Sequence, residues 1–313
     1  MAIIGIVKPE ETNSFFTLEC LQTCILLSHT IGKQVNYYMN SNKIVKFLQM
    51  TTEFWEFETF QGTIHPESNF LFHTVRKMIR YYFLVTTFGF IFFLINPPVC
   101  YVPEGWELFL RIVRALTFWS YYTSTMATDA FFVACGTLLL IQFKLLGHKF
   151  KNLDTQSQEK WNNLRQNVKH QIFLHRSCKL LNQIFAVVFL IQFLNSIAAL
   201  AISIFIFSKP GSWNNRFKTL FYLVVVLFEN AFYCVPAELV SAEALKICDQ
   251  LFASKWYESN VAQFRKSLVI VLCCTQKVIK FSSFGLVEMN LQTFVLISKT
   301  ALSFYAFLNQ LKR

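Results

Sequence analysis

The sequence carries little charge. Only 15% of its 313 residues are Asp, Glu, Lys or Arg, whereas a soluble domain averages about a quarter. This shortage excludes an ordinary water-soluble fold. Glycine and proline are also scarce, at 9 and 7 residues. The chain has no inverted repeat and no Gly/Pro-broken apolar segment of the kind typical of secondary transporters, which argues against a transporter.

Motifs that identify an enzyme or a bound cofactor are absent too. The sequence contains no GxxxxGK[ST] phosphate loop, GxSxG nucleophile elbow, HExxH zinc motif or DxDxDG calcium loop. Its 9 cysteines form no paired CxxC units and its 6 histidines are scattered, so we expect no zinc site. The sequence therefore predicts a protein that is not an enzyme, with no catalytic residue, metal or cofactor.

Apolar residues dominate instead. They make up 54% of the chain, which includes 36 Phe and has a mean hydropathy of +0.40. Several runs approach the roughly 20 apolar residues that a helix needs to cross a bilayer, and helices satisfy their own backbone hydrogen bonds there. We predict an all-α polytopic transmembrane bundle over residues 1–313, surrounded by membrane lipid. Its predicted spans are about 15–38, 81–97, 112–143, 181–207, 219–240 and 285–308.

Basic residues indicate the orientation of this bundle. The connections after the first, third and fifth segments hold 20 of the 29 Lys and Arg residues, with Lys33 at the start of the first connection. Cytoplasmic loops carry such an excess, so the net charge of +11 needs no nucleic-acid partner. Both ends of the chain are then external. An external start on the weak first segment is unfavourable, and it suggests either that a preceding span is missing or that the first segment is not inserted alone.

The two longer cytoplasmic connections have helical patterns of their own. Apolar residues recur at near-helical intervals between Trp161 and Leu180 and again between Ala244 and Phe252. We therefore expect helices over about 144–180 and 241–284 that extend from the spans into the cytoplasm and pack together.

The final segment, LQTFVLISKTALSFYAFLNQLKR (Leu291–Arg313), is unusually polar for an anchor. Thr300, Ser303, Phe307 and Gln310 follow one another at intervals of three or four residues, so they share one face of a helix. Small hydroxyls beside a ring suit a pore that closes by dewetting. They suit helix–helix packing equally well.

Among the charged residues inside predicted spans, Lys299 and Asp129 stand out, because a charge there costs on the order of 3 kcal/mol. Lys299 occupies the middle of the final segment, and a positive charge would hinder a cation pore, so we expect it to be buried between helices. Asp129 lies in the third segment, where we consider a structural pairing with a neighbouring span.

Three stretches, taken in order, resemble the insect odorant receptor family. The first is NLRQNVKHQIFLHRSCKLLNQIF (163–185), a hydrophobic and basic helix with a His before the next span. The second runs from Tyr233-Cys234 through a helix to Phe252, Trp256-Tyr257 and Gln276-Lys277. The third is KTALSFYAFL (299–308), which is similar to the final span of the family. Asp129 also resembles an acidic residue of the family's fourth span.

The resemblance implies a subunit of a tetrameric, odorant-gated, non-selective cation channel. Its partners would be the odorant receptor co-receptor and a small volatile odorant. Its location would be the plasma membrane of olfactory sensory neuron dendrites. The final span would line the pore with Thr300, Ser303, Phe307 and Gln310, and Phe307 would lie at the gate. The extended cytoplasmic helices would hold the tetramer together.

The resemblance also places the odorant in the outer half of the membrane, among the family's second, third, fourth and sixth spans. A small apolar pocket with one or two hydroxyls suits a volatile ligand. Lipid-facing or core positions would explain the same residue types. The expected ligand contacts are Cys20, Cys24, Phe92, Phe118, Tyr121, Tyr122, Met126, Tyr222 and Val225.

Two alternatives accompany this interpretation. Gustatory receptors share the architecture and the final span, so a gustatory-type receptor with tastant ligands is the nearest alternative. The family has seven spans, and only six are found, so the segment 15–38 aligns with the family's second span. A truncated gene model, a fragment or a degenerate, nonfunctional receptor would each explain the difference.

Overall fold

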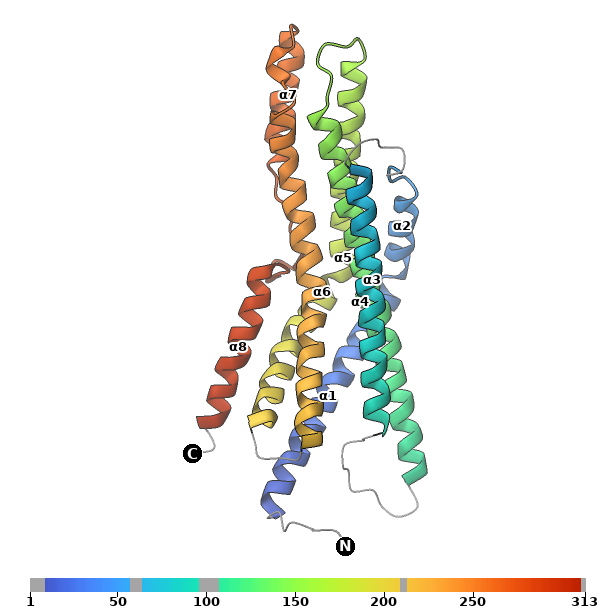
Figure 1. The fold of residues 1–313 in the computed structure, drawn as a ribbon, viewed down its shortest axis with the longest axis vertical. Coiled ribbons are helices and arrows are strands. Elements are labelled where there is room, and N and C mark those ends of the chain that lie inside the picture. The colour runs from blue at the N-terminus through green and yellow to red at the C-terminus, as the bar shows by residue number, and fades with distance from the viewer. Residues whose placement is uncertain (1–8, 57–63, 96–106, 209–212, 311–313) are drawn as a thin grey trace.

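The computed structural model describes residues 9–56, 64–95, 107–208 and 213–310 of the chain. It is a bundle of long helices, with one short hairpin before the last helix (Figure 1). The elements are α1 (Pro9–Met39), α2 (Ser41–Thr51), α3 (Ile64–Ile95), α4 (Glu107–Lys151), α5 (Lys160–Ser208), α6 (Trp213–Phe252), the 3-10 turn η2 (Trp256–Glu258), α7 (Ala262–Thr275), β1 (Ser282–Ser283), β2 (Val287–Glu288) and α8 (Leu291–Gln310). The predicted all-α membrane bundle is confirmed.

Each predicted span overlaps a helix, and most helices are longer than the spans. The start of the span 285–308 was wrong, because the chain forms the hairpin there and α8 begins only at Leu291. Three helical stretches in the described chain are long and apolar enough to cross a membrane, namely Trp119–Lys151, Lys160–Ser208 and Arg216–Glu258, and Leu291–Phe307 is a shorter apolar helix. Hydropathy detects only the apolar part of a helix that continues into polar surroundings, so α3 begins at Ile64 and not near Tyr81. The end of the span 81–97, with the rest of 96–106, and residues 209–212 between α5 and α6 lie outside the described residues.

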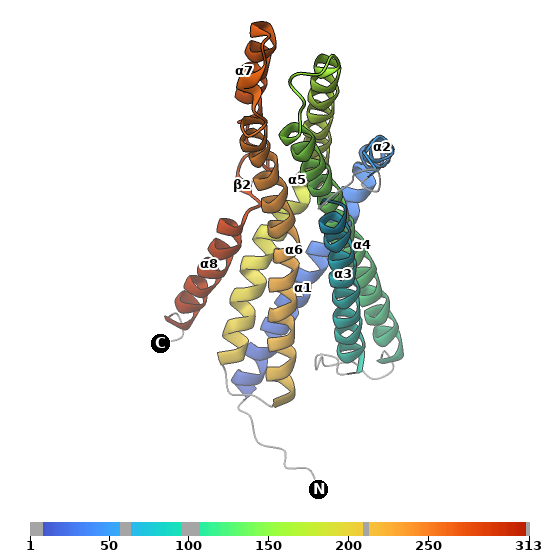
Figure 2. The same ribbon diagram turned by 45° about the horizontal axis from the view of Figure 1, so that its top comes forward.

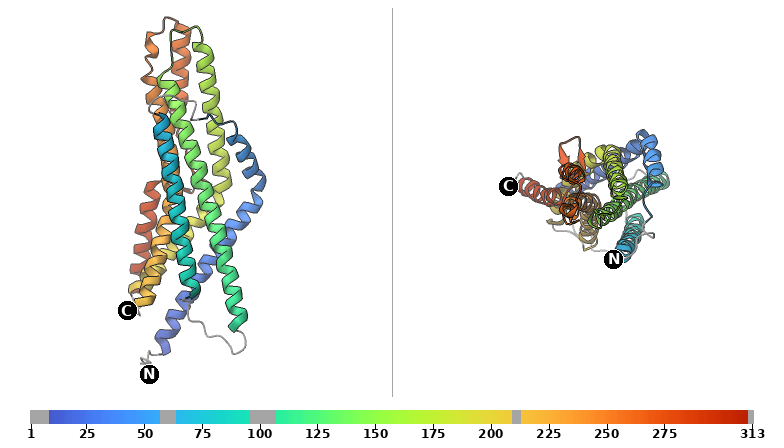
Figure 3. Two further views of the ribbon diagram at one scale, coloured as in Figure 1. Left: turned by 45° about the vertical axis from the view of Figure 1, so that its right-hand side comes forward. Right: turned by 90° about the horizontal axis from the view of Figure 1, so that it is seen from above.

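The bundle divides into groups toward one end. Figure 2 shows α3 and α4 as a pair on one side, α8 on the other, and α1, α5 and α6 between them. The start of α1 and the end of α8 lie toward the same end of the molecule, and α7 and the α4–α5 connection lie at the opposite end (Figures 1 and 3). The long axis therefore runs from the diverging helices to a narrower region built by the extended parts of α4, α5, α6 and by α7.

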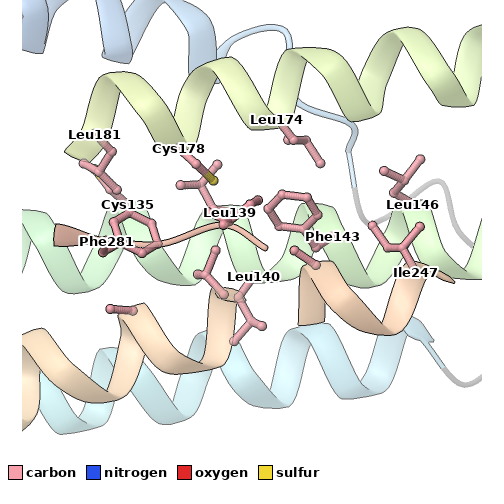
Figure 4. Packing of buried hydrophobic residues seen from close by; sticks show 14 of the residues in the cluster. Cys135, Leu139, Leu140, Phe143, Leu146, Leu174, Cys178, Leu181, Ile247 and Phe281 are labelled. Atoms are coloured by element: carbon pink, nitrogen blue, oxygen red, sulfur yellow. The ribbon is translucent and has the colours of Figure 1, made fainter. Parts of the chain in front are cut away.

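The narrower region contains the main hydrophobic core. Buried side chains from α4, α5, α6 and the hairpin interdigitate there, as Figure 4 shows for Leu139, Phe143, Cys178, Ile247 and Phe281 among others. At the start of α5, Trp161 also packs edge-to-face on Phe264 of α7, with ring centroids 5.1 Å apart. The helices expected over 144–180 and 241–284 thus do pack together. Neither predicted helix is continuous. The first is interrupted between Lys151 and Lys160, and the second after Phe252, where Lys255 adopts a left-handed conformation (φ 53°) before η2. The end of the prediction 241–284 was wrong, because α7 ends at Thr275 and the chain continues into the hairpin.

Helices α4 and α6 form the most extensive contact between elements in the described chain. Gly136 on α4 makes a close approach possible, because a Cβ atom added there would lie 3.1 Å from Cβ of Pro236. Pro236 lies inside α6, where the ring removes one helical hydrogen bond and favours a kink. Gly136, which has no side chain, therefore lies opposite Pro236 and allows the two helices to pack closely.

The hairpin β1–β2 connects α7 to α8. Ser282 pairs with Glu288 and Ser283 with Val287, and the turn is closed by Leu286 N–H donating to Ser283 O at 2.8 Å. Both central residues, Phe284 and Gly285, have positive φ (50° and 77°), as in the tight turns that suit twisted hairpins. The Ser282 N–H donates to Asn182 Oδ1 of α5 at 2.7 Å. This bond fixes the start of α8 against the bundle.

Candidate functional site

A cluster of charged side chains is buried at the centre of the bundle. Lys33 on α1 donates from Nζ to Asp129 Oδ1 on α4 at 2.8 Å and to Glu229 Oε1 on α6 at 2.6 Å. Lys33 and Asp129 have fully buried side chains, and Glu229 keeps 4% of its surface exposed. One lysine therefore joins three helices that are far apart in sequence.

Two tyrosines complete the environment of Asp129. The Tyr82 hydroxyl of α3 donates to Oδ2 at 2.9 Å, and the Tyr233 hydroxyl of α6 donates to Oδ1 at 2.5 Å. With Lys33, the carboxylate accepts three hydrogen bonds. A buried carboxylate is tolerated when it is paired and hydrogen-bonded in this way.

The cluster continues to α5 through uncharged groups. His29 Nε2 is 2.7 Å from Gln192 Oε1 and 3.6 Å from Glu229 Oε1. Gln192 Nε2 donates to Ser196 Oγ at 3.1 Å, and Ser196 Oγ donates to Asn230 Oδ1 at 2.9 Å. The polar cluster joins α1, α3, α4, α5 and α6. We define it as His29, Lys33, Tyr82, Asp129, Gln192, Ser196, Glu229, Asn230 and Tyr233.

The polar cluster tests two statements made from the sequence. Lys33 does not lie in a cytoplasmic connection, because it is inside α1 and fully buried. The placement was wrong because a lysine near the end of a weak apolar segment resembles a loop residue. The structural pairing considered for Asp129 is confirmed, and its partners lie on α1, α3 and α6.

The residues predicted to contact a ligand lie on α1, α3, α4 and α6. Tyr122 is buried, with its hydroxyl 2.7 Å from Thr87 Oγ1 of α3, and Met126 Sδ accepts from Thr86 Oγ1 at 3.2 Å. Tyr121, Tyr222 and Val225 are half-buried, and Cys24 is exposed on α1. The side chains of Cys20, Phe92 and Phe118 lie outside the described residues. The structure therefore brings Tyr122 and Met126 together at the α3–α4 contact.

Helical spacing relates several of these residues to the polar cluster. On α4, Tyr121 and Asp129 are eight residues apart, which is close to two turns on one face. On α6, Val225 and Tyr222 precede Glu229 by four and seven residues, again on one face. The predicted ligand contacts on these two helices thus lie one to two turns from the charged residues, toward the end where the helices diverge.

Helix α8 uses one face for packing and leaves the other uncovered. Thr293, Ile297 and Ala301 are buried where α8 contacts α5 and α6. Ser303, Phe307 and Gln310 are exposed, and Thr300 is half-buried. The Ser303 hydroxyl donates to Lys299 O within the helix at 3.1 Å. The predicted stripe is therefore not used for helix packing inside this chain.

The expectation for Lys299 was wrong. Its side chain is exposed, because the helix face that packs on α5 and α6 is the one with Ile297 and Ala301. Residues between Ile297 and Ala301, such as Lys299, point away from the covered face of the helix. The periodicity of small and apolar residues at 293, 297 and 301 would have identified the packed face.

A second polar site lies in the extended part of the bundle, at the end of the predicted span 112–143 and before the predicted span 181–207. The Trp55 ring stacks on His170 of α5 with centroids 3.7 Å apart and planes at 9°. Gln142 of α4 accepts from Trp55 N–H at 3.0 Å, donates to Trp55 O at 2.8 Å and lies 3.1 Å from His170 Nε2. Lys149 Nζ lies 4.0 Å above the Trp55 ring. Burial, together with the nearby charge of Lys149, lowers the pKa of His170 to about 4.

Comparison with known proteins supports the family resemblance found in the sequence. The family model described as 7tm Odorant receptor matches residues 16–302. No curated protein matches the chain. Among solved structures, the olfactory receptor OR5 of Machilis hrabei in complex with eugenol is similar with a TM-score of 0.83 at 14% identity, covering 95% of this chain and 82% of that one.

A second structure of the same olfactory receptor, described without eugenol, is similar with a TM-score of 0.83 at 15% identity. It covers 94% of this chain and 81% of that one. At such low identity these structures show a shared fold, and the family model carries the assignment because it spans most of the chain. This chain therefore belongs to the insect odorant receptor family, as an all-α membrane receptor that is not an enzyme.

Proposed function

We propose that this receptor is the odorant-tuning subunit of a cation channel that it forms with the odorant receptor co-receptor in the plasma membrane of olfactory sensory neuron dendrites. The observation that carries the proposal is the uncovered face of α8. Phe307 on this face is 52% exposed, and Ser303 and Gln310 share the face. In a tetramer, four such faces around one axis would line a pore.

The chemistry of this face suits a gated pore. Hydroxyl and amide groups hydrate a permeating ion, and a ring of Phe307 side chains would close the path by dewetting. In a mixed tetramer the co-receptor subunits supply their own gate residues, which leaves room beside Phe307. Helices α1, α3, α4 and α6 would hold the odorant in their outer halves, near Tyr121, Tyr122, Met126, Tyr222 and Val225, with Cys20, Cys24, Phe92 and Phe118 as the remaining proposed contacts.

The test is electrical. The chain is expressed with the co-receptor in oocytes or a cultured cell line, and currents are recorded with a broad panel of volatile odorants. The proposal predicts an odorant-evoked, non-selective cation current that is absent with the co-receptor alone. Arrival at the cell surface without any odorant-evoked current would contradict the proposal.

A further inference from the structure

The uncovered side of α8 is divided into an apolar and a polar stripe. The apolar stripe consists of exposed side chains that share one face, namely Leu291, Val295 and Leu302. The polar stripe consists of exposed side chains on a neighbouring face, namely Gln292, Lys299, Ser303 and Gln310. Lys299 therefore belongs to the same stripe as Ser303 and Gln310, which we propose to line the pore.

Lys299 has no counter-charge within the described part of the chain. No carboxylate there lies within ion-pair distance of its ammonium group. Figure 2 shows α8 at one edge of the described bundle, and its packed face is the opposite one, with Ile297 and Ala301. The charge must therefore be stabilised by something outside this chain.

Lipid cannot supply that stabilisation. A lysine near a helix end can extend its ammonium group to the membrane surface, but Lys299 lies about 12 Å along the axis from the start of α8 at Leu291. Charged side chains at such positions face a water-filled space or an ionic partner. The amide and hydroxyl groups on the same stripe are suited to water.

We propose that the Lys299 ammonium group faces the water-filled pore and makes the channel favour monovalent over divalent cations. The inference rests on the proposed function and narrows its permeant ions. Rings of charged side chains set the selectivity of pores. Coulomb repulsion is proportional to the charge of the ion, so Lys299 repels Ca²⁺ about twice as strongly as Na⁺ at the same distance.

The strength of this repulsion depends on how many lysines surround the pore. In a mixed tetramer only the tuning subunits supply Lys299, so the positive ring is incomplete and Na⁺ can pass. An assembly of this chain alone would present a complete ring of positive charge, which opposes the entry of every cation. Lys299 thus also gives a physical reason for assembly with a second kind of subunit.

A charge series at position 299 tests the selectivity role. The chain is expressed with the co-receptor, and the permeability of Ca²⁺ relative to Na⁺ is obtained from the reversal potential of the odorant-evoked current. Lys299→Gln should raise this ratio at least twofold, and Lys299→Glu should raise it further. Lys299→Arg, which keeps the charge, should keep the wild-type ratio.

The matched control is Lys266→Gln, which removes an exposed lysine of α7 and should leave the permeability ratio unchanged. A ratio that does not follow the charge at position 299, or that changes equally in Lys266→Gln, would overturn the proposal.

Thiol labelling measures the surroundings of Lys299 without any current. Lys299→Cys and Leu302→Cys place thiols on the polar and apolar stripes, and each variant is purified with the co-receptor in lipid nanodiscs. A charged maleimide should label Lys299→Cys at least tenfold faster than Leu302→Cys, after subtraction of the wild-type labelling. Slow labelling at both positions, as for a lysine buried against the co-receptor, would overturn the proposal.

These measurements separate the selectivity role from the proposed function. A wild-type assembly that reaches the cell surface and gives no odorant-evoked current would contradict the channel function and, with it, the role of Lys299. Odorant-evoked currents whose permeability ratio is the same in the wild type, Lys299→Gln and Lys299→Glu would support the channel function and overturn the selectivity role alone.

Discussion

Lys33 is the residue on which the centre of the bundle depends most. Its ammonium group contacts Asp129 and Glu229 at 2.8 and 2.6 Å. Lys33→Met would remove this positive charge from both buried carboxylates. Breaking a buried ion pair by removing one partner costs about 3–5 kcal/mol. We therefore expect Lys33→Met to lower the amount of receptor at the cell surface severalfold, as measured by surface labelling of a tagged chain.

The matched control for this variant is Lys46→Met, which removes an exposed lysine of α2 and should leave surface labelling unchanged. Adding Asp129→Asn to Lys33→Met removes one of the stranded charges and should restore part of the labelling. Equal surface levels for Lys33→Met and Lys46→Met would show that the ion pairs contribute little.

His170 gives the chain an acid sensitivity. Its folded-state pKa is lowered from 6.5 to about 4 by burial, so the unfolded chain takes up a proton at a higher pH than the folded chain. The free energy of unfolding should therefore fall as pH decreases from about 6.5 to about 4. At about 1.4 kcal/mol per pKa unit, this loss is at most about 3 kcal/mol.

The measurement is the thermal unfolding midpoint of the purified receptor across this pH range, for the wild type and His170→Gln. The variant should show a flatter profile, whereas His73→Gln, at an exposed histidine of α3, should follow the wild type. Parallel profiles for the wild type and His170→Gln would mean that the stacked pair of Trp55 and His170 does not titrate as described.

At the level of elements, the α4–α6 contact depends on a missing side chain. A Cβ at position 136 would lie 3.1 Å from Pro236 Cβ, so the larger, branched side chain of Gly136→Val would force the helices apart. Overpacking of this kind costs about 1–3 kcal/mol. We expect the thermal unfolding midpoint to fall by several degrees, while Ala134→Val, at an exposed position of α4, should have little effect.

The elements themselves were largely predictable from the sequence. Continuous apolar runs locate the helices α4, α5 and α6, since crossing a bilayer demands such runs. The lengths of the helices were underestimated, because the apolar run in the sequence ends before the helix does. The hairpin before α8 was missed, since its strands are only two residues long and it depends on a contact with Asn182, 100 residues away.

The polar cluster could be predicted only in part. Asp129 attracts notice because a carboxylate in an apolar run is costly. Its partner Lys33 is 96 residues earlier, and nothing local distinguishes a buried lysine near the end of a helix from a loop lysine. Glu229 gave the same signal, since it lies inside the predicted span 219–240, and it was overlooked. Such pairings are set by how helices pack, and one sequence contains no record of that packing.

For the whole molecule, the structure separates two regions of different character. The diverging helices carry the polar cluster and the proposed odorant contacts, and the extended region has the larger hydrophobic core. Helix α8 meets the rest of the chain through one face and the hairpin. A ligand that changes the packing of α4 against α6 can thus act on α8 through α5 and α6, which α8 contacts.

Cysteine accessibility along α8 tests most directly whether its exposed face lines the pore. Ser303→Cys and Ala301→Cys place thiols on the exposed and buried faces of the same helix turn, and each variant is expressed with the co-receptor. We predict that a charged, thiol-reactive reagent applied during odorant stimulation reduces the current of Ser303→Cys by more than half and leaves Ala301→Cys and the wild type unchanged. Equal sensitivity of the two variants, or modification of Ala301→Cys alone, would contradict a pore along this face.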